Sequence, residues 1–303
     1  MKKLFMLMNV ATLAVLAACG SSGDSGNPDT LVMGFVPSQD SDTIAETAEP
    51  LAEKLGEILD KEVDAQTMTS YSALVEALGN DTAHIGFIPA FGFVLADSQY
   101  EVEPILKSER NGSATYVAQY LVRADSPVES LEDLGEHAQD MIWAYGDASS
   151  TSGYLFPASQ LINMYDLEGT TALQEDFFKD TVSSGGHDAS AVAVLQEQAD
   201  IATTFDDVRD TMVEDYPNIM DELKVIGTTD PIPNDTITVP SSLDDELVQE
   251  IKEAFLSFND DEEMIQIMNE VYNWDAIIEA ERSDFDVVKE TYENLELGTE
   301  VLE

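Results

Sequence analysis

The sequence predicts an α/β protein of two lobes, each built on a mainly parallel sheet covered by helices. Short apolar runs of strand length alternate with segments of helical periodicity from Thr30 onward, and this alternation is typical of parallel sheets with covering helices. About 275 residues follow the N-terminal leader, which is enough for two lobes. Strand-like segments near 121–126 and 227–235 join the two α/β units, so we expect a cleft between the lobes.

The first lobe is expected to comprise residues 30–122 and 231–303. Its first strand is the apolar run "TLVMGFVP", and a helix over 42–61 follows, in which apolar side chains recur on one face (Ile44, Ala48, Leu51, Leu55, Ile58 and Leu59). Strand "EVDAQTM", helix "YSALVEALG", strand "HIGFIPA", helix "FGFVLAD" and a strand around 102–107 come next. Residues 243–303 have the periodicity of two or three amphipathic helices.

The second lobe is expected to span residues 123–230. The long alternating strand "ATYVAQYLVRAD" leads into it, and "SPVESLEDL" resembles a helix start with proline in the first turn. Strands "DMIWAYG", "FFKDTVSS" and "ADIATTFD" then alternate with helices over 151–165, 188–198 and 207–215. Two strand-like runs around the Pro-rich turn in "LKVIGTTDPIPNDTITV" form a plausible return crossing.

The N-terminus has the layout of an export signal, with two lysines, an apolar segment and small residues before a cysteine. The pattern from Leu16 to Cys19 resembles a bacterial lipoprotein signal, which implies cleavage of residues 1–18 and a lipid on Cys19. Ordinary cleavage near a signal-helix cysteine is the alternative. Residues 19–29 are Gly/Ser-rich and are expected to form a flexible tether. We therefore expect an extracytoplasmic protein held at the membrane by its lipid alone.

The composition excludes several classes of function. Acidic residues outnumber basic ones 61 to 13, for a formal net charge of −48, which excludes a general basic surface for nucleic acid or anionic lipid. Ordinary apolar content, 44%, indicates a folded chain, and the acidity indicates a salt-tolerant source. Cys19 is the only cysteine, so no disulfide framework is expected. The sequence lacks zinc, calcium-loop, Walker and dinucleotide motifs, so we expect no metal and no cofactor.

The segment "GDASSTSGYLFP", 146–157, places short hydroxyl side chains between a strand and a helix. Ligands of open α/β sheets bind at the carboxyl ends of strands, where first-turn N–H groups and the helix dipole favour an anion. Ser149, Ser150, Thr151 and Ser152 would add neutral donors, and Gly153 would let the backbone come close. A simple helix N-cap with surplus serines explains the local composition equally well.

Other strand exits have a similar layout. Ser38 and Gln39 follow the first strand, Tyr71 follows Thr69 and Ser70 at a helix start, and His187 lies in the Gly/Ser turn "SSGGHDAS". We expect Ser38, Gln39, Tyr71 and His187 to contact the ligand.

A feature of opposite charge ends the strand "ADIATTFD" at Asp206 and Asp207. A carboxylate facing an oxyanion is repulsive unless a proton lies between them, so it selects ligands that keep an O–H or carry an ammonium. Helix capping by one aspartate and solvation of the other is the alternative.

Taken in order, these segments resemble the solute-binding lipoproteins of phosphate, phosphite and phosphonate ABC importers, the PhnD-like family. The resemblance covers nearly the whole mature chain and depends on "GFVPSQD", "YSALVEAL", "HIGFIPAFGFVLAD", "YLVRADSPVESLEDL", "DASSTSGYLFP", "GGHDASAVAVLQEQADIATTFDD" and "PIPND". It implies a type-II periplasmic-binding-protein fold, a non-enzymatic function, a small phosphorus-oxyanion ligand, an ABC permease as partner and a monomer.

The resemblance also implies roles for individual residues. Ser150, Thr151 and Ser152 would hold the ligand oxygens, Tyr71 and His187 would donate to them from the two lobes, and Asp206 or Asp207 would accept an O–H or amino group. The chain departs from the family at Phe91 and Phe93, where many relatives have a tyrosine, so one expected hydroxyl is missing.

Three other functions are compatible with the same residues. A binding protein of this fold could take a sulfonate, a pyrimidine precursor or a chelated metal, and binding independent of the aspartate would favour a sulfonate. A secreted hydrolase could use Ser150 or Ser152 with His187, and turnover lost on Ser→Ala substitution would identify it. A structural surface lipoprotein would bind no solute.

Overall fold

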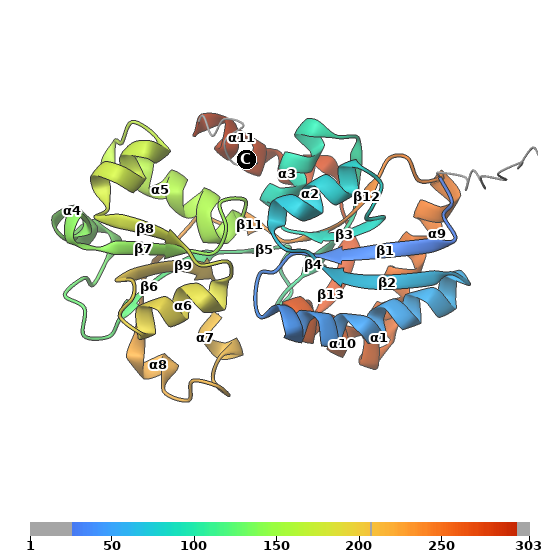
Figure 1. Cartoon of the computed structure of the whole chain (residues 1–303), viewed down its shortest axis with the longest axis horizontal. Coiled ribbons are helices and arrows are strands. Elements are labelled where there is room, and N and C mark those ends of the chain that lie inside the picture. The colour runs from blue at the N-terminus through green and yellow to red at the C-terminus, as the bar shows by residue number, and fades with distance from the viewer. Residues whose placement is uncertain (1–25, 207, 296–303) are drawn as a thin grey trace, which may run out of the picture.

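Two β-sheets, one in each lobe, organise the chain in the computed structural model (Figure 1). The structure describes residues 26–206 and 208–295. The expected signal peptide, Cys19 with the first part of the tether, and Asp207 lie outside the described residues. Among the described helices, none combines the length and apolarity needed to cross a lipid bilayer.

The first lobe contains a six-stranded sheet with the order β13-β4-β12-β3-β1-β2. Strands β1, β2 and β3 pair in parallel, whereas β12 pairs antiparallel with β3 and β4, and β13 pairs antiparallel with β4. The sheet is therefore more mixed than the mainly parallel one expected, because the chain returns from the second lobe through β12 in the opposite direction. The strands are β1 (Thr30–Phe35), β2 (Glu62–Thr67), β3 (Ile85–Ile88), β4 (Val102–Glu109), β12 (Thr236–Pro240) and β13 (Ala276–Glu279).

Helices cover both faces of this sheet (Figure 1). They are α1 (Ser41–Leu59), α2 (Tyr71–Gly79), α3 (Ala90–Gln99), α9 (Asp245–Ser257), α10 (Glu262–Tyr272) and α11 (Asp286–Asn294). Helix α1 begins where the Asp40 carboxylate accepts a hydrogen bond from Thr43 N at 2.9 Å, a typical N-cap. Ile44, Ala48, Leu51 and Leu55 are buried on its inner face and Leu59 packs against the core, but Ile58 is 45% exposed, so Ile58 lies outside the buried face.

The second lobe contains a five-stranded sheet with the order β10-β6-β9-β7-β8. Its strands are β6 (Ala118–Arg123), β7 (Ile142–Tyr145), β8 (Asp180–Ser183), β9 (Ile201–Phe205) and β10 (Leu223–Thr228). Strand β7 is parallel to β8 and β9, and β6 is antiparallel to β9 and β10. The helices are α4 (Leu134–His137), α5 (Phe156–Tyr165), α6 (His187–Leu195), α7 (Val208–Thr211) and α8 (Ile219–Glu222). The expected boundary at 122/123 falls at the far end of β6, which pairs in this sheet along its whole length.

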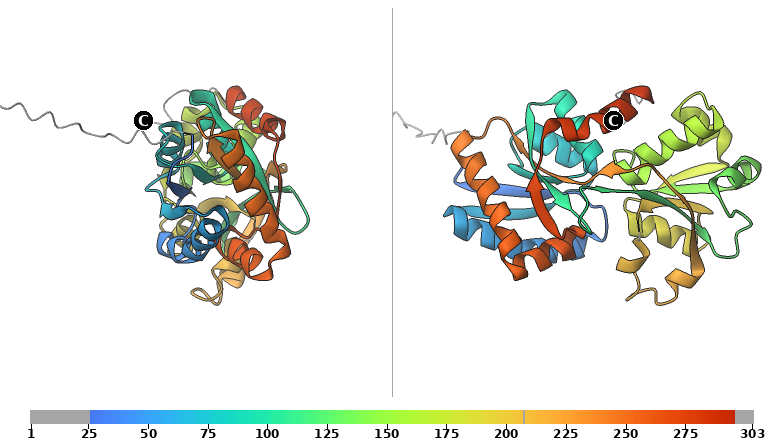
Figure 2. Two further views of the ribbon diagram at one scale, coloured as in Figure 1. Left: turned by 90° about the vertical axis from the view of Figure 1, so that its right-hand side faces the viewer. Right: turned by 180° about the vertical axis from the view of Figure 1, so that it is seen from behind.

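Two chain crossings connect the lobes, as the view from behind shows (Figure 2). The outgoing crossing contains β5 (Thr115–Tyr116) and the return crossing contains β11 (Ile232–Pro233), and these strands pair antiparallel. The long strand expected over 114–125 is therefore interrupted between β5 and β6. This interruption places Tyr116 between the two lobes.

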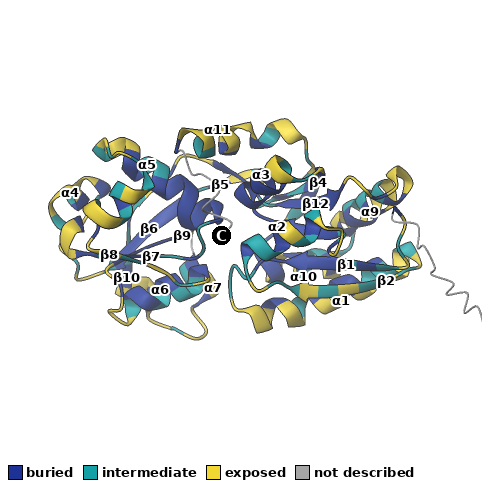
Figure 3. Cartoon of the chain, turned by 45° about the horizontal axis from the view of Figure 1, so that its top comes forward, coloured by how far each residue is buried: buried dark blue, intermediate teal, exposed yellow. Residues whose placement is uncertain are grey.

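The central strands of each sheet are buried, whereas the edge strands β2 and β8 are partly exposed, as are the outer faces of the helices (Figure 3). Stacked aromatic rings mark both cores, Phe35 on Phe87 at 4.6 Å in the first lobe and Trp143 on Tyr154 at 5.6 Å in the second. Strand β13 lies in a region where only helices were expected. Its four residues are too few to produce a clear periodic pattern, and the edge of β4 supplies its hydrogen-bonding partners.

Candidate ligand-binding site

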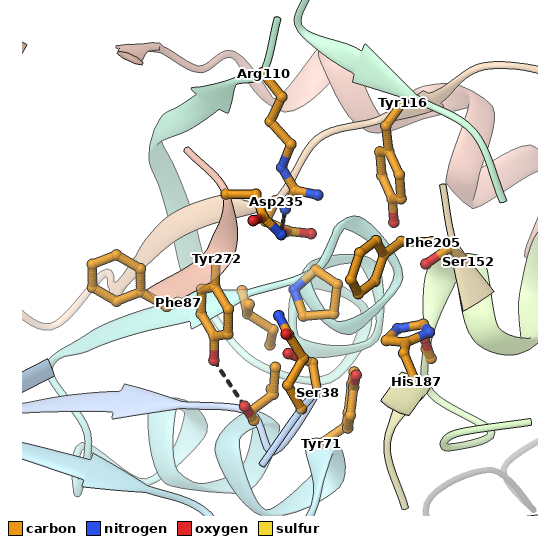
Figure 4. Close-up of a pocket in the computed structure, with 16 residues that line it drawn as sticks. Ser38, Tyr71, Phe87, Arg110, Tyr116, Ser152, His187, Phe205, Asp235 and Tyr272 are labelled. Carbon is orange, nitrogen blue, oxygen red and sulfur yellow. Dashed lines mark hydrogen bonds and ion pairs between the residues drawn. The ribbon is translucent and has the colours of Figure 1, made fainter. Parts of the chain in front are cut away.

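A small pocket lies between the lobes at the carboxyl ends of β1, β3 and β9, with a cavity volume of about 30 Å³. A single water needs about 10–15 Å³ by this kind of measure, so the pocket suits a ligand of a few heavy atoms. The apolar lining residues are Val36, Phe87, Ile88 and Pro89 from the first lobe and Phe205 from the second. The other lining side chains are mainly polar and come from both lobes (Figure 4). We call this cavity the central pocket.

The hydroxyl-rich turn lies against the central pocket, as expected. Ser149, Ser150, Thr151 and Ser152 are at most 3% exposed, and Ser150 and Ser152 line the pocket. Ser150 also caps the following helix, because its Oγ accepts a hydrogen bond from Gly153 N at 3.0 Å. The helix starts as a π-helical turn, Thr151–Leu155, before α5. A Cβ on Gly153 would lie 2.9 Å from Ser150 Oγ, so a larger residue here would displace the Ser150 side chain from its capping position.

Thr151 takes part in contact between the lobes and is not among the pocket-lining residues. Its Oγ1 accepts a hydrogen bond from Phe91 N, at the start of α3 in the first lobe, at 2.9 Å. A second bond of this kind runs from His187 N in the second lobe to Ser38 O in the first, also at 2.9 Å. The two lobes are thus directly hydrogen-bonded at two places near the pocket.

Three tyrosines bring hydroxyl groups to the central pocket: Tyr71, Tyr116 and Tyr272. Burial raises the pKa of the Tyr71 phenol well above its usual value, and the Asp147 carboxylate adds to this effect. Burial is also the main cause of the raised pKa values of Tyr116 and Tyr272. All three phenols therefore keep their protons at neutral pH. The single O–H of Tyr272 is already donated to Val36 O at 2.7 Å, so Tyr71 and Tyr116 are the phenols that can donate a hydrogen bond to an anion.

His187 opens α6 and lines the pocket from the second lobe. The residue is 4% exposed, its ring packs edge-on against Phe205 at 5.1 Å, and its Nδ1 is buried without a hydrogen-bond partner. Burial lowers the pKa of the imidazole to about 3, with a contribution from the Arg110 guanidinium. A neutral imidazole carries one N–H, so His187 can donate one hydrogen bond without adding a charge.

The remaining predicted site residues are placed differently. Ser38 and Gln39 line the central pocket. Asp206 is exposed, donates its backbone N–H to Val117 O at 3.0 Å, and lines a neighbouring cavity of about 380 Å³. We call this cavity the side chamber. Asp207 is not described.

An ion pair that sequence reasoning did not assign to the site lines the central pocket. Arg110 follows β4, Asp235 precedes β12, and the guanidinium bonds the carboxylate. Their side chains are 13% and 17% exposed. Asp235 lies in the quoted "PIPND" segment, and Arg110 is one of only 13 basic residues in the chain. These signals were present, but a pairing over 125 positions is not visible in local patterns.

Phe91 and Phe93 belong to the core of the first lobe. Phe91 packs against Tyr292 at 5.3 Å and Phe93 against Phe285 at 4.9 Å, and neither lines the central pocket. Tyr116 and Tyr272, which were not among the predicted site residues, also line the central pocket.

Comparison with known families agrees with this geometry. Residues 33–285 match the family described as "ABC transporter, phosphonate, periplasmic substrate-binding protein". The chain belongs to this family. The expected resemblance is thereby confirmed, and membership places this phosphonate-binding-family protein outside the cytoplasm, among the solute-binding proteins of ABC importers.

Individual relatives support the same assignment. The chain is 24% identical over 257 residues to the phosphate-import protein PhnD of Mycolicibacterium smegmatis, covering 81% of this chain and 79% of that one. It is 32% identical over 148 residues to the phosphonates-binding periplasmic protein of Escherichia coli, covering 49% of this chain and 42% of the relative.

Solved structures confirm the two-lobed type-II periplasmic-binding-protein fold. A binding protein component of an ABC phosphonate transporter from Pseudomonas aeruginosa superposes with a TM-score of 0.80 at 20% identity, covering 90% of this chain and 91% of that one. PhnD1 from Prochlorococcus marinus, in complex with methylphosphonate, gives a TM-score of 0.76 at 21% identity, covering 89% and 99%.

Proposed function

We propose that this family member is the lipid-anchored receptor of an ABC importer and captures a phosphonate, phosphite or phosphate oxyanion in the central pocket. Tyr71, Ser150, Ser152 and His187 donate hydrogen bonds to the ligand oxygens. Ser38 and Gln39 complete the first-lobe side of the site.

The convergence of neutral donors from both lobes on one small pocket carries this proposal. A ligand that contacts both lobes stabilises the closed state by the contacts that form only there. The hydroxyls and the neutral imidazole bind an anion without adding buried positive charge. The net charge of −48 does not oppose this, because surface charges are screened over about 8–10 Å at physiological salt, whereas hydrogen bonds in a dry pocket are not.

The apolar lining residues from the first lobe, Val36, Phe87, Ile88 and Pro89, favour a ligand with one apolar corner. A P–H or P–CH₃ group would lie against these residues while the oxygens face the donors. Asp235 takes the role predicted for Asp206 or Asp207, which is to accept a hydrogen bond from the ligand. Its carboxylate lines the central pocket, and the oxygen lone pairs that Arg110 leaves open can accept a ligand O–H.

Delivery to a permease and anchoring through Cys19 complete the proposed function. Membership of an ABC transporter family supports a permease partner, and the sequence around Cys19 supports the lipid. Replacing Cys19 with serine is expected to move the protein from the membrane fraction to the soluble fraction. Retention of the variant in the membrane fraction would refute the anchor.

A thermal-shift panel tests the ligand class. Phosphate, phosphite, methylphosphonate, 2-aminoethylphosphonate and sulfate are compared, and the preferred phosphorus ligand is expected to stabilise the protein by about 4 kcal/mol at about a thousand times its Kd. Indifference to all four phosphorus compounds would overturn the proposed function.

Ser149 provides a matched control, because it belongs to the same turn and is buried, but does not line the pocket. Ser152→Ala is expected to weaken ligand binding by roughly tenfold or more, as for a lost hydrogen bond to a charged group. Ser149→Ala is expected to leave affinity nearly unchanged. Equal effects of the two substitutions would show that Ser152 does not contact the ligand.

A further inference from the structure

Arg110 lies at the boundary between the central pocket and the side chamber. Four residues line both cavities: Arg110, Tyr116, Phe205 and Asn273. The guanidinium carbon lies 5.2 Å from the centre of the Tyr116 ring, a cation–π contact, and the guanidinium bonds Asp235 (Figure 4). These contacts hold the side chain in place as part of the wall.

The two cavities differ in size and in charge. The central pocket has a volume of about 30 Å³ and the side chamber about 380 Å³. Asp206, Asp210 and Asp275 line the side chamber. Arg110 is the only lysine or arginine among the described residues that line either cavity. A ligand too long for the central pocket could extend toward the side chamber, past Arg110 and its neighbours.

The guanidinium favours small anions over ligands with an amino group. It stays charged at any physiological pH, and its Nε is buried without a partner, so a donor remains available beside the pocket. Asp235 is already paired with it. Asp235 is the one carboxylate among the described residues that line the central pocket, so an ammonium group held there would lie beside a like charge with its only carboxylate already paired, and such juxtapositions cost several kcal/mol.

We propose that Arg110 is the residue that determines specificity, restricting the site to small oxyanions with at most a methyl substituent and excluding aminoalkylphosphonates. It does so in two ways. Its side chain closes the passage to the side chamber, and its guanidinium pairs with the Asp235 carboxylate, which is then not available to a ligand ammonium group. This inference rests on the proposed function and specifies the ligand class of that site.

The test compares methylphosphonate, n-propylphosphonate and 2-aminoethylphosphonate by isothermal titration calorimetry. The last two have nearly equal length and differ in the ammonium, so they separate size from charge. For the wild type, methylphosphonate is expected to bind at least roughly tenfold more tightly than propylphosphonate, and propylphosphonate more tightly than 2-aminoethylphosphonate.

Two substitutions separate the charge of Arg110 from its bulk. Arg110→Met keeps most of the bulk, removes the charge and frees Asp235, so 2-aminoethylphosphonate is expected to gain at least roughly tenfold relative to propylphosphonate. Arg110→Ala also opens the wall, so both long ligands should gain. Adding Asp235→Asn to Arg110→Met should abolish the gain for 2-aminoethylphosphonate. Arg123→Met, which removes a guanidinium paired with Asp125 at 3.1 Å outside the site, should leave all three affinities unchanged.

The outcomes distinguish a failure of the role proposed for Arg110 from a failure of the proposed function. Wild-type protein that binds 2-aminoethylphosphonate as tightly as propylphosphonate would overturn the role of Arg110 while the proposed function stands, even if the variants fold poorly. An unchanged ratio of the two long ligands in a folded Arg110→Met variant would do the same. Failure of the wild type to bind any of the three would overturn the proposed function, and this inference with it.

Discussion

The neutral, buried His187 predicts a specific loss of stability in mild acid. Burial holds the folded-state pKa of this imidazole at about 3, whereas an unperturbed histidine has a pKa near 6.5. Between these values the unfolded chain binds more protons than the folded one, so stability falls as the pH falls from 6.5 toward 3. Above about pH 6.5 both states are neutral at this residue and the effect vanishes.

The magnitude follows from the size of the shift. Each pH unit below 6.5 lowers the free energy of unfolding by about 1.4 kcal/mol. The total loss is about 2 kcal/mol at pH 5 and about 3 kcal/mol at pH 4. No reduction for solvent screening is needed, because His187 is 4% exposed. The 61 acidic residues also titrate, and their protonation relieves repulsion, so the raw pH dependence of unfolding does not isolate the histidine.

The assay is therefore a difference between two proteins. Urea unfolding of the wild type and of His187→Gln is measured from pH 7.5 to pH 4, with and without saturating methylphosphonate. The carboxylate background is common to both proteins and cancels. Between pH 7.5 and pH 5, the free energy of unfolding is expected to fall by about 2 kcal/mol more in the wild type than in the variant. A flat difference curve in both conditions, or one of opposite sign, would refute the assignment of a buried neutral imidazole.

Three further substitutions test the contacts around the site. Thr151→Val leaves Phe91 N without its partner and is expected to lower ligand affinity by about 1–3 kcal/mol; calorimetry that finds Thr151→Ser equally impaired would contradict this. Tyr71→Phe removes a donor and should weaken binding roughly 10- to 100-fold with unchanged circular dichroism. Asp188 and Asp40 line a groove between the lobes. Burial and, to a smaller extent, the negative charge of Asp40 raise the pKa of Asp188. Ionised Asp188 therefore lowers the free energy of unfolding, and this loss grows as the pH rises through that pKa. Asp188→Asn removes this charge and should therefore increase ligand affinity a few-fold at neutral pH and low salt. Charges are screened over about 3 Å at about 1 M salt, so an increase in affinity that persists there would show that charge is not its cause.

Much of the candidate site could be predicted because its parts are local. Ser150 and Ser152 each lie at a junction of strand and helix, and so do Tyr71 and His187. Short apolar runs and helical periodicity locate such junctions, and parallel strands in one sheet bring their carboxyl ends to the same edge. The same logic anticipated that Ser38 would lie beside them.

The acidic side of the site could not be assigned in this way. Asp206 follows a strand just as Ser38 does, yet it faces the side chamber, whereas Asp235 lines the central pocket from the return crossing. Each carboxylate lies next to the end of a strand, and the local sequence does not show which cavity it faces. The direction of a side chain at a crossing depends on where the crossing strands pair, and that pairing joins β5 to β11 across more than a hundred positions.

The sequence by itself determined the two-lobed α/β class and the family, and it predicted the hydroxyl and histidine side chains that line the central pocket, because each of these depends on motifs that are local in the chain. Tertiary structure alone decided that Arg110 pairs with Asp235, that Thr151 bonds Phe91 across the cleft, and that His187 is buried enough to stay neutral. Ion pairing and desolvation depend on distances between segments far apart in the chain. No local pattern encodes those distances, so the charge balance of the pocket depends on the tertiary structure.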